Sequence, residues 1–278
     1  MSATELQQTQ GGIELPDLTV VVPARNAEAL LVDCLESVRR AAPSEIVVVD
    51  GNSTDGSVSL ARRYGATILS DEGRGLPAAR TLGVRHAKTP FVALIDADVV
   101  LPDSALRDLL EEFRTGGYTA LQAGLHSEGG PGYWGRALAS HHRTGLSKNW
   151  FGVVATIMER DTLLRHGFDD RFLSGEDIDL RHRLTRSGGR IGVSQRTFVA
   201  HRFAEDSFAF AKSQWLADGR GLGRMVQAHG WRRAHLALLP LAAMVRGVGL
   251  SIARGQWRWL PYYVCFGVYN YVGMLGSK

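Results

Sequence analysis

The first half of the chain alternates short apolar runs with amphipathic segments, and this alternation sharply limits the folds open to it. Each apolar run is short enough to be a buried strand, and each is followed by a segment with helical spacing. Strands that alternate with helices predict an α/β fold with a mostly parallel sheet covered on both faces. The runs are LTVVVP (18–23), EIVVVD (45–50), ATILS (66–70) and FVALID (91–96).

The segments between these runs have the spacing and the end signals of helices. After the first run, one helical face gathers four apolar residues, namely Leu31, Cys34, Leu35 and Val38. After the second, we expect Ser53 or Thr54 to cap a helix that runs to Tyr64 and stops at Gly65. These elements account for the chain as far as the fourth strand.

Carboxylates stand where predicted strands end. Asp50 closes the second run, Asp96 closes the fourth, and Asp98 follows two residues later. Because such sheets bind ligands at the carboxyl ends of their strands, we expect these side chains to share one crevice. Alternation along extended backbone sends Asp96 and Asp98 to one side, with the small Ala97 between them. A hard divalent cation with a phosphate ligand suits such a pair, although most pairs of this spacing are exposed turn aspartates.

Composition favours one domain with an appendage. With 278 residues, 45% of them apolar, the chain can bury one substantial core. Its two cysteines, Cys34 and Cys265, have neither metal-ligand spacing nor a disulfide framework, which favours a reducing cytosol. The polar start shows no secretion signal. We expect a flexible N-terminus (1–14), an α/β domain (15–205) and a helical extension (206–278).

The extension is basic. Residues 219–278 hold eight Lys or Arg and no Asp or Glu, so residues 1–218 carry 24 basic against 28 acidic side chains. No nucleic-acid-binding motif accompanies this charge, and no nucleic-acid partner is expected. Its mixture of arginines, tryptophans and tyrosines suits an anionic membrane surface. Residues 234–245 are too short to span a bilayer and 259–277 barely long enough, so helices lying in the interface are favoured; packing on the domain, or a homodimer through the extension, is the alternative.

Five motifs, taken in order, resemble the family 2 inverting glycosyltransferases, whose nucleotide-sugar domain has the GT-A fold. They cover roughly Leu18 to His201, most of the chain, and an ordered set is far more specific than any single motif. They read VVVPARNAEALLVDCLESV, EIVVVDGNSTDGS, GRGLPAARTLG, FVALIDADVVLP and GFDDRFLSGEDIDLRHRL.

The resemblance implies a binding site for a nucleotide-sugar donor. Where the family often has two successive aspartates, this chain has Asp50 followed by Gly51. A UDP-sugar stays slightly favoured over a GDP-sugar. Capping of the next helix is an alternative role for Asn26, as is surface solvation for Arg74. The implied donor-binding residues are Pro23, Arg25, Asn26, Asp50, Arg74, Arg80, Asp96, Ala97 and Asp98.

The resemblance also implies the catalytic acids and the metal ligands. Asp177 would be the general base, and Glu176 would orient the acceptor or assist the base, although carboxylates also favour a helix N-terminus for structural reasons. Asp96, Asp98 and His201 would hold Mn²⁺ or Mg²⁺. Asp179 is expected to face solvent or to pair with Arg183, and His141 and His142 are weaker candidates, on a helix near the acceptor.

The implied activity is metal-dependent transfer of a sugar, with inversion, to an acceptor hydroxyl that a lipid could carry. Membrane attachment would place this peripheral enzyme on the cytoplasmic face, in cell-surface glycan assembly. Two alternatives remain at this point. One is a sugar-phosphate nucleotidyltransferase, which also uses a parallel sheet and paired aspartates, although no Lys-bearing phosphate loop is evident. The other is a catalytically idle module that binds nucleotide sugar.

Overall fold

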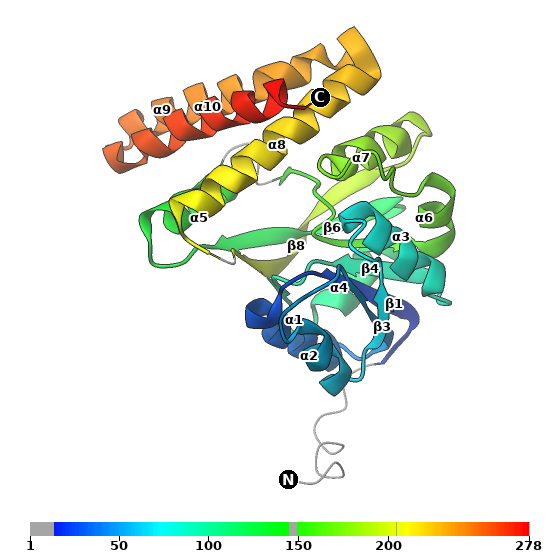
Figure 1. The fold of residues 1–278 in the computed structure, drawn as a ribbon. Helices are drawn as coiled ribbons and strands as arrows, with labels where there is room; N and C mark the ends of the chain where they lie inside the picture. Colours follow the sequence, from blue (N-terminus) through cyan, green and yellow to red (C-terminus); the bar gives the residue numbers. More distant parts are fainter. Residues whose placement is uncertain (1–13, 145–148, 204, 278) are drawn as a thin grey trace.

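A computed structural model describes residues 14–144, 149–203 and 205–277 (Figure 1). The described residues form one eight-stranded sheet flanked by helices, with a helical extension above it. The strands are β1 (Leu15–Ala24), β2 (Pro43–Asp50), β3 (Thr67–Ser70), β4 (Phe91–Ile95), β5 (Val99–Val100), β6 (Ala120–Glu128), β7 (Ala155–Glu159) and β8 (Ile191–Arg202). The helices are α1 (Glu28–Arg40), α2 (Ser57–Arg63), α3 (Leu76–His86), α4 (Ala105–Gly116), α5 (Tyr133–Arg143), α6 (Arg160–His166), α7 (Glu176–Arg186), α8 (Phe208–His229), α9 (Leu239–Ala253) and α10 (Leu260–Leu275), with 3₁₀ turns η3 (Gly230–Leu238) and η4 (Trp257–Trp259).

The strand order, β3-β2-β1-β4-β7-β6-β8-β5, combines a parallel half with a mixed half. β3, β2, β1 and β4 pair in parallel, as the alternating sequence predicts. β7 then runs antiparallel to both β4 and β6, and β5 antiparallel to β8. The prediction of a mostly parallel sheet therefore holds for the first half of the chain, while the second half makes the sheet mixed.

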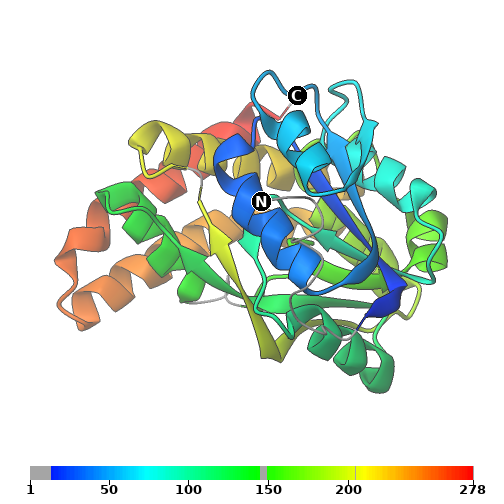
Figure 2. The same cartoon turned by 90° about the horizontal axis from the view of Figure 1, so that it is seen from below.

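Two apolar clusters cover the two faces of the sheet. On one face, α1, α2 and α4 pack on alternate residues of β1 such as Val20 and Val22. On the other face, α3, α6 and α7 pack on Val21 and its neighbours. This alternation is the period of two expected of a strand buried on both sides. Figure 2, seen from below, shows α1 in front of the sheet.

The N-terminal end of α2 differs from the expected cap. The helix begins at Ser57, after Gly56, so neither Ser53 nor Thr54 caps it. Instead the Ser53 amide donates to the Asp50 carboxylate, and the Thr54 amide donates to Asn26 Oδ1 at 2.8 Å. Both residues thus brace the loop between β2 and α2. Tyr64 and Gly65 end the helix where expected.

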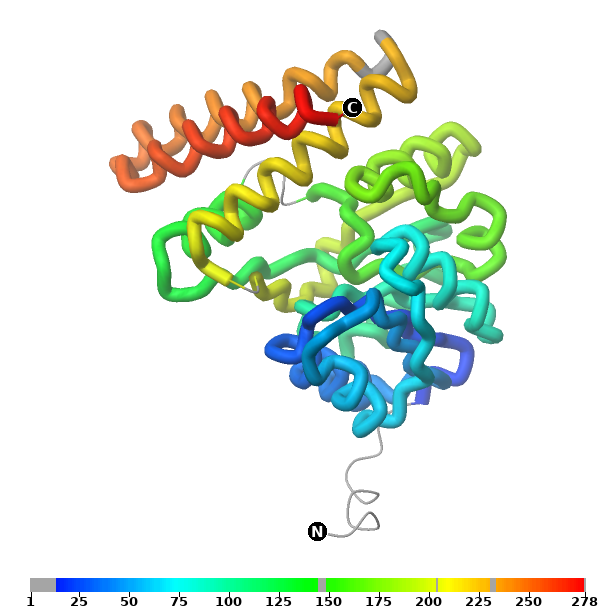
Figure 3. Tube along the Cα trace, in the orientation of Figure 1, coloured from blue at the N-terminus to red at the C-terminus, as the bar shows by residue number. Residues whose placement is uncertain are grey.

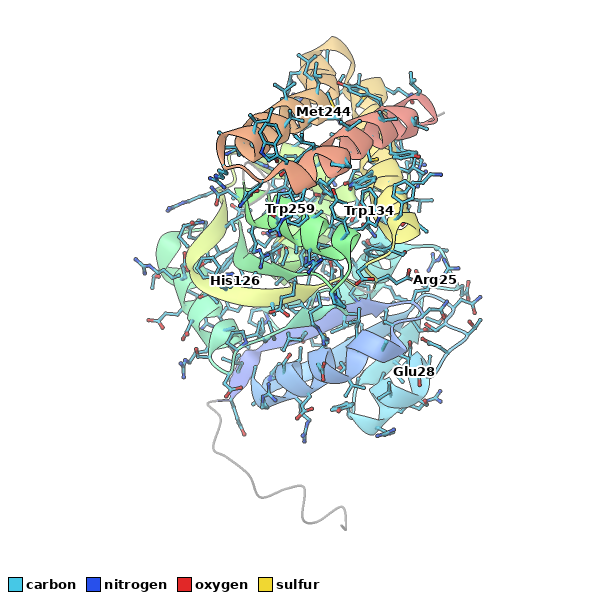
Figure 4. All side chains as sticks on the ribbon, turned by 90° about the vertical axis from the view of Figure 1, so that its left-hand side faces the viewer. Arg25, Glu28, His126, Trp134, Met244 and Trp259 are labelled. Carbon is cyan, nitrogen blue, oxygen red and sulfur yellow. The ribbon has the colours of Figure 1, made fainter. Side chains whose placement is uncertain are left out.

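The extension stacks α9 and α10 over α8, and Figure 3 shows α9 and α10 side by side. Glycines allow the helices to approach closely: a Cβ on Gly219 would lie 2.0 Å from Asn270 O, and one on Gly273 would lie 2.4 Å from Leu216 O. An aromatic cluster that includes Trp215, Tyr262 and Trp259 joins α8 and α10 to α5. Figure 4 shows Trp134 and Trp259 where α5 meets the extension, with Met244 above them.

One helical stretch of the extension is longer than expected. The sequence prediction stopped at Val245, before Arg246, whereas the helix continues and gives an apolar stretch from Ala234 to Ala253, 20 residues long. By length and composition alone it is the one candidate span within the described residues, and 22% of its most apolar window is buried. The earlier estimate of its length was therefore wrong, because a single arginine does not interrupt a helix.

Candidate active site

The loop after β1 is held against the loop after β2. Asn26 has a left-handed backbone (φ 48), its amide donates to Ser53 Oγ at 3.0 Å, and its side chain accepts from Thr54. Asp50, 9% exposed at the end of β2, accepts from the Ser53 amide at 3.2 Å. Pro23 is buried in β1. The structure therefore gathers Pro23, Asn26 and Asp50 at one end of two neighbouring parallel strands, as expected.

Gly51 has a steric reason to be glycine. A Cβ there would lie 3.1 Å from Arg25 Cβ, and the Gly51 amide donates to Ala24 O at 2.8 Å. A larger residue would push the first loop, with Arg25, away from the second. Arg25 itself is exposed and free to meet a ligand.

Arg74 is carried by a loop that Asp71 organises. Asp71 is 1% exposed, and its two carboxylate oxygens accept from the amides of Gly73 at 2.8 Å and Gly75 at 3.0 Å. Arg74 Nε donates to Asp71 O at 3.0 Å, but the side chain stays exposed. Asp71 was not foreseen from the sequence, although an aspartate at a strand end before glycines is a typical turn signal.

Arg80 lies at the centre of the site, buried between two carboxylates. It is 1% exposed on α3; its Nη2 donates to Asp96 Oδ1 and its Nη1 to Glu176 Oε1, both at 2.8 Å. The sequence prediction gave Arg80 a place near the donor diphosphate, whereas the structure commits its guanidinium to these two acids. Its position joins the end of β4 to the start of α7.

Burial sets the ionisation of this cluster. Two carboxylates share one guanidinium, so the cluster would carry a net negative charge inside the protein if both acids were ionised. Burial raises the pKa of Glu176 to about 7 against the opposing effect of Arg80. Burial raises the pKa of Asp96 as well, also against Arg80. This cluster therefore takes up a proton at a higher pH than ordinary carboxylates do.

Asp98 faces away from Arg80 and contacts His201. Its Oδ2 lies 3.3 Å from His201 Nε2, and the pairing of β5 with β8 places Val99 opposite His201. Burial lowers the pKa of His201, but the hydrogen bond to Asp98 and the charges of Asp98 and Asp96 outweigh it and raise the pKa overall. Ala97, between the two aspartates, packs on the apolar cluster of α1 and α4.

The residues expected to ligate a metal fit that role in part. Within the described ranges, no group of three or more His, Cys, Asp or Glu side chains is placed to hold an ion. Asp98 Oδ1 and His201 Nδ1 are nevertheless buried without a hydrogen-bond partner. A carboxylate oxygen left unpaired in a buried site suits a hard cation that a substrate phosphate completes. Asp98 and His201 fit, while Asp96 is engaged by Arg80.

Asp177 opens α7 beside Glu176, and its carboxylate turns the other way. Its Oδ2 accepts from Trp150 Nε1 at 3.2 Å. Burial raises its pKa, and the bond from Trp150 opposes that effect. The segment that carries Trp150 is fixed by the buried Gln122, which donates to Trp150 O at 3.0 Å and accepts from the Gly152 amide at 2.8 Å. Neither Trp150 nor Gln122 was foreseen, because their partners are distant in sequence.

The third acid of the motif, Asp179, is structural. It is 3% exposed and accepts from Arg183 at 2.7 Å, so of the two expected roles the ion pair is confirmed. The expected helix start at Glu176 is confirmed too, with Leu180 and Leu184 fully buried.

A cavity of about 290 Å³ lies beside Asp177, between the α/β domain and the extension. Asp177 and His201 both line it, and so do His141 and His142 of α5. The ring of His142 stacks near that of His201, with 6.3 Å between centroids. Asp218 of α8, which the sequence reasoning did not single out, lines the wall formed by the extension.

This arrangement is the GT-A glycosyltransferase fold. A mannosyltransferase from Pyrobaculum calidifontis, solved with GDP-mannose and Mn²⁺, superposes with a TM-score of 0.64 at 19% identity over 98% of this chain and 92% of its own. Glucosyl-3-phosphoglycerate synthase from Mycobacterium tuberculosis, solved with Mn²⁺, UDP and phosphoglyceric acid, gives 0.57 at 20% identity over 77% and 78%.

The sequence comparisons agree with the fold. The glycosyl transferase family 2 model matches residues 19–172, and the chain belongs to that family. It is 25% identical over 300 residues to the succinoglycan biosynthesis protein ExoA of Rhizobium meliloti. The aligned region covers 98% of this chain and 89% of that protein. The predicted family and fold are therefore confirmed, and the protein is a glycosyltransferase.

Proposed function

We propose that this glycosyltransferase moves a sugar from a nucleoside diphosphate donor to an acceptor hydroxyl, with a divalent cation and with inversion at the anomeric carbon. One observation carries the proposal. A single cavity touches both Asp177, a carboxylate with a raised pKa, and His201, whose imidazole contacts Asp98. A proton acceptor thus shares one space with His201, the member of the proposed cation-binding pair that lines the cavity.

Asp177 acts as the general base. It takes the proton of the acceptor hydroxyl as the oxygen attacks the anomeric carbon from the side opposite the diphosphate, and a single displacement of this kind inverts that centre. The raised pKa suits the role, since a stronger base removes the proton more readily. Trp150 orients the carboxylate by its 3.2 Å hydrogen bond, and Glu176 is held away by Arg80.

Asp98 and His201 would hold the cation, and Mn²⁺ or Mg²⁺ there would supply positive charge opposite the diphosphate. The mannosyltransferase and the synthase described above were both solved with Mn²⁺. Pro23, Arg25, Asn26, Asp50 and Arg74 form the donor side, where the exposed Arg25 and Arg74 suit phosphate oxygens. We favour a UDP-sugar slightly over a GDP-sugar as the donor. A thermal-shift screen of both classes with Mn²⁺ shows which one stabilises the protein.

The cation assignment is tested with Asp98→Asn. Wild-type protein should gain thermal stability from its donor in a Mn²⁺-dependent way, because a ligand that binds only the native state raises its stability. Asp98→Asn should lose this Mn²⁺-dependent stabilisation, and it should also lose transferase activity. Asp103→Asn, an exposed position, is the matched control and should behave as wild type. Turnover by Asp98→Asn at the parent rate with the same Mn²⁺ dependence would show that the cation lies elsewhere.

The rival reaction class is separated by its product. A nucleotidyltransferase would release pyrophosphate from a nucleoside triphosphate and a sugar phosphate, whereas the proposed reaction releases a nucleoside diphosphate. An idle module would do neither. Family membership and Asp177 at the cavity support transfer.

We also propose that the extension attaches the enzyme to the cytoplasmic face of an anionic membrane, with helices lying in the interface. Two exposed apolar stripes support this: they recur at helical spacing and comprise Leu241, Val245 and Ile252 on α9, and Val264, Val268, Val272 and Leu275 on α10. The exposed Trp257, Arg254 and Arg258 lie at the turn between the helices. Apolar stripes beside aromatic and basic side chains are typical of interfacial helices.

Attachment is tested by sedimentation with phosphatidylglycerol liposomes. The full chain should sediment at low salt and be partly released by high salt, since screening weakens its basic contacts. Val268→Glu should reduce the bound fraction. Leu164→Glu, at a 40% exposed leucine on α6, is the control and should change nothing. Wild-type protein that stays in the supernatant at low salt would leave the stripes as a protein interface, for which a homodimer is the simplest form.

A further inference from the structure

The cavity beside Asp177 combines an apolar wall with a small polar end. At about 290 Å³ it lies near the lower limit of small-molecule sites, which measure roughly 300 to 1,000 Å³. Leu239, Pro240 and Ala243 of α9 line its far side, and Asp177 lies on the wall formed by the α/β domain. Apolar walls with few convergent polar groups are typical of sites for amphiphilic small molecules.

A second carboxylate enters this cavity from the extension. Asp218 lies on the face of α8 that also presents Trp215 and Leu222, and its side chain is accessible from the cavity. No hydrogen bond or ion pair to Asp218 occurs within the part of the chain that the structure describes. Desolvation by the surrounding protein raises its pKa to about 7, and the charge of Asp177 adds to the effect. Both carboxylates line the same cavity.

The position of Asp218 is fixed by contacts between α8 and the start of α7. Ser174 Oγ donates to Ala217 O at 2.6 Å, immediately before Asp218. Gly175 has a left-handed backbone (φ 87), and a Cβ on Gly221 would lie 3.0 Å from Gly175 N. The backbones are thus in direct contact where Asp177 begins α7. Asp218 is therefore held as firmly as Asp177, and among the described residues no ion pair neutralises its charge.

Helix α9 is apolar on the side that faces the cavity and also on the opposite, exposed side. Ala243 faces the cavity, while Leu241 and Val245, two residues away on either side, are 42% and 59% exposed. One helix therefore presents apolar surface both to the cavity and to the outside. An apolar chain inside the cavity would contact Leu239, Pro240 and Ala243 of this helix.

We propose that this cavity is the acceptor subsite and that the acceptor is an amphiphile: its apolar chain lies along α9, and its head carries at least two hydroxyls, one facing Asp177 and a second bonded to Asp218. The proposal rests on the proposed role of Asp177 as the base. A carboxylate accepts well from a hydroxyl neighbouring the one that reacts, and so orients it. Asp218 is a positioning residue in this scheme, because the attacking oxygen faces Asp177.

The experiment measures direct binding of model amphiphiles by the full-length protein, with octyl β-glucoside below its micellar concentration, methyl β-glucoside and octanol as probes. Octyl β-glucoside should bind more tightly than methyl β-glucoside. Ala243→Trp, which fills the cavity, should lower the affinity for octyl β-glucoside by about tenfold or more, equivalent to about 1.4 kcal/mol. Ala242→Trp, on the exposed face of the same helix, is the control and should bind as wild type.

Asp218→Asn supplies a second arm that does not depend on filling the cavity. This variant should lower the affinity for octyl β-glucoside severalfold and leave the affinity for octanol unchanged, since octanol has no second hydroxyl. Equal losses in Ala243→Trp and Ala242→Trp, no preference for the octyl chain, or full octyl β-glucoside affinity in Asp218→Asn would each overturn the proposal. Binding of the nucleotide donor, measured separately, should be unchanged in all three variants. If wild-type protein does not bind the donor, that result would refute the proposed function and not the subsite.

Discussion

The end of β4 and the start of α7 each present two acids, and in each region the two acids have separated. Asp96 and Glu176 both bond to Arg80 at 2.8 Å. Asp98 and Asp177 face away from it, the first toward His201 and the second toward Trp150. The regions differ in the partner of the acid that is not bound to Arg80. An imidazole beside an unpaired buried oxygen suits a cation, whereas a neutral indole leaves a carboxylate able to take a proton.

An acidic motif therefore does not by itself show which of its acids is available for a functional role. The two acids of each motif have similar acidity in water, and a buried arginine selects one of each pair for structure. The acid left over is the functional candidate.

Exchanging the acids of α7 tests the division most severely. Asp177→Asn keeps size and removes the base, so kcat for transfer should fall by about 10² to 10⁴ while donor affinity changes little. Glu176→Gln should lower kcat less, because Glu176 is bound to Arg80. Steady-state kinetics of both variants decides the matter: a larger loss of kcat in Glu176→Gln would reverse the two roles.

Removing Arg80 tests whether it holds both regions together. Arg80→Met leaves Asp96 and Glu176 without their common partner, and breaking a buried ion pair in this way should cost about 3 to 5 kcal/mol of unfolding free energy. Urea unfolding measures it. Arg74→Met, at an exposed arginine two residues before α3, should change stability by less than about 0.5 kcal/mol. Similar small values for both variants would mean that Arg80 does not carry the cluster.

The ionisation of Glu176 predicts a smaller, pH-dependent effect. Its folded pKa, about 7, is raised above its ordinary value of 4.5, so the folded state binds the proton more tightly. The stability this contributes is fully present below pH 4.5 and is lost as pH rises through about 7. Glu176→Gln should therefore flatten the decline of Tm between these values, and Glu111→Gln, at an exposed glutamate, should leave it as in wild type. A decline that is unchanged in Glu176→Gln would place the titration elsewhere, with Asp218 the next group to test.

The sequence was sufficient for those parts of the fold that depend on local periodicity. The strand end at Asp50, the strand end just before Asp96, the helix start at Glu176 and the apolar faces of α1 and α7 all follow from spacing, and the structure has them there. The family resemblance added which acids to consider. Neither source could show that Arg80 is buried between two acids, because that depends on contacts across 16 and 96 residues.

The remaining differences have the same origin. Ser53 and Thr54 are good caps by composition, but the loop before α2 uses them to hold Asn26 and Asp50. Arg246 marked the end of an apolar run in the sequence, whereas the helix carries it on an exposed face and continues. Asp218 drew no attention because no motif surrounds it; its neighbours in the cavity come from other helices.

Arg80 also has a consequence for how the chain can vary. Because one guanidinium serves the end of β4 and the start of α7 at once, a change at Asp96 alters the surroundings of Glu176, although the two acids are 80 positions apart in sequence. Substitutions at the two positions are therefore not independent: the effect of one depends on which residue occupies the other. The end of β4 and the start of α7 therefore constrain each other's substitutions through Arg80.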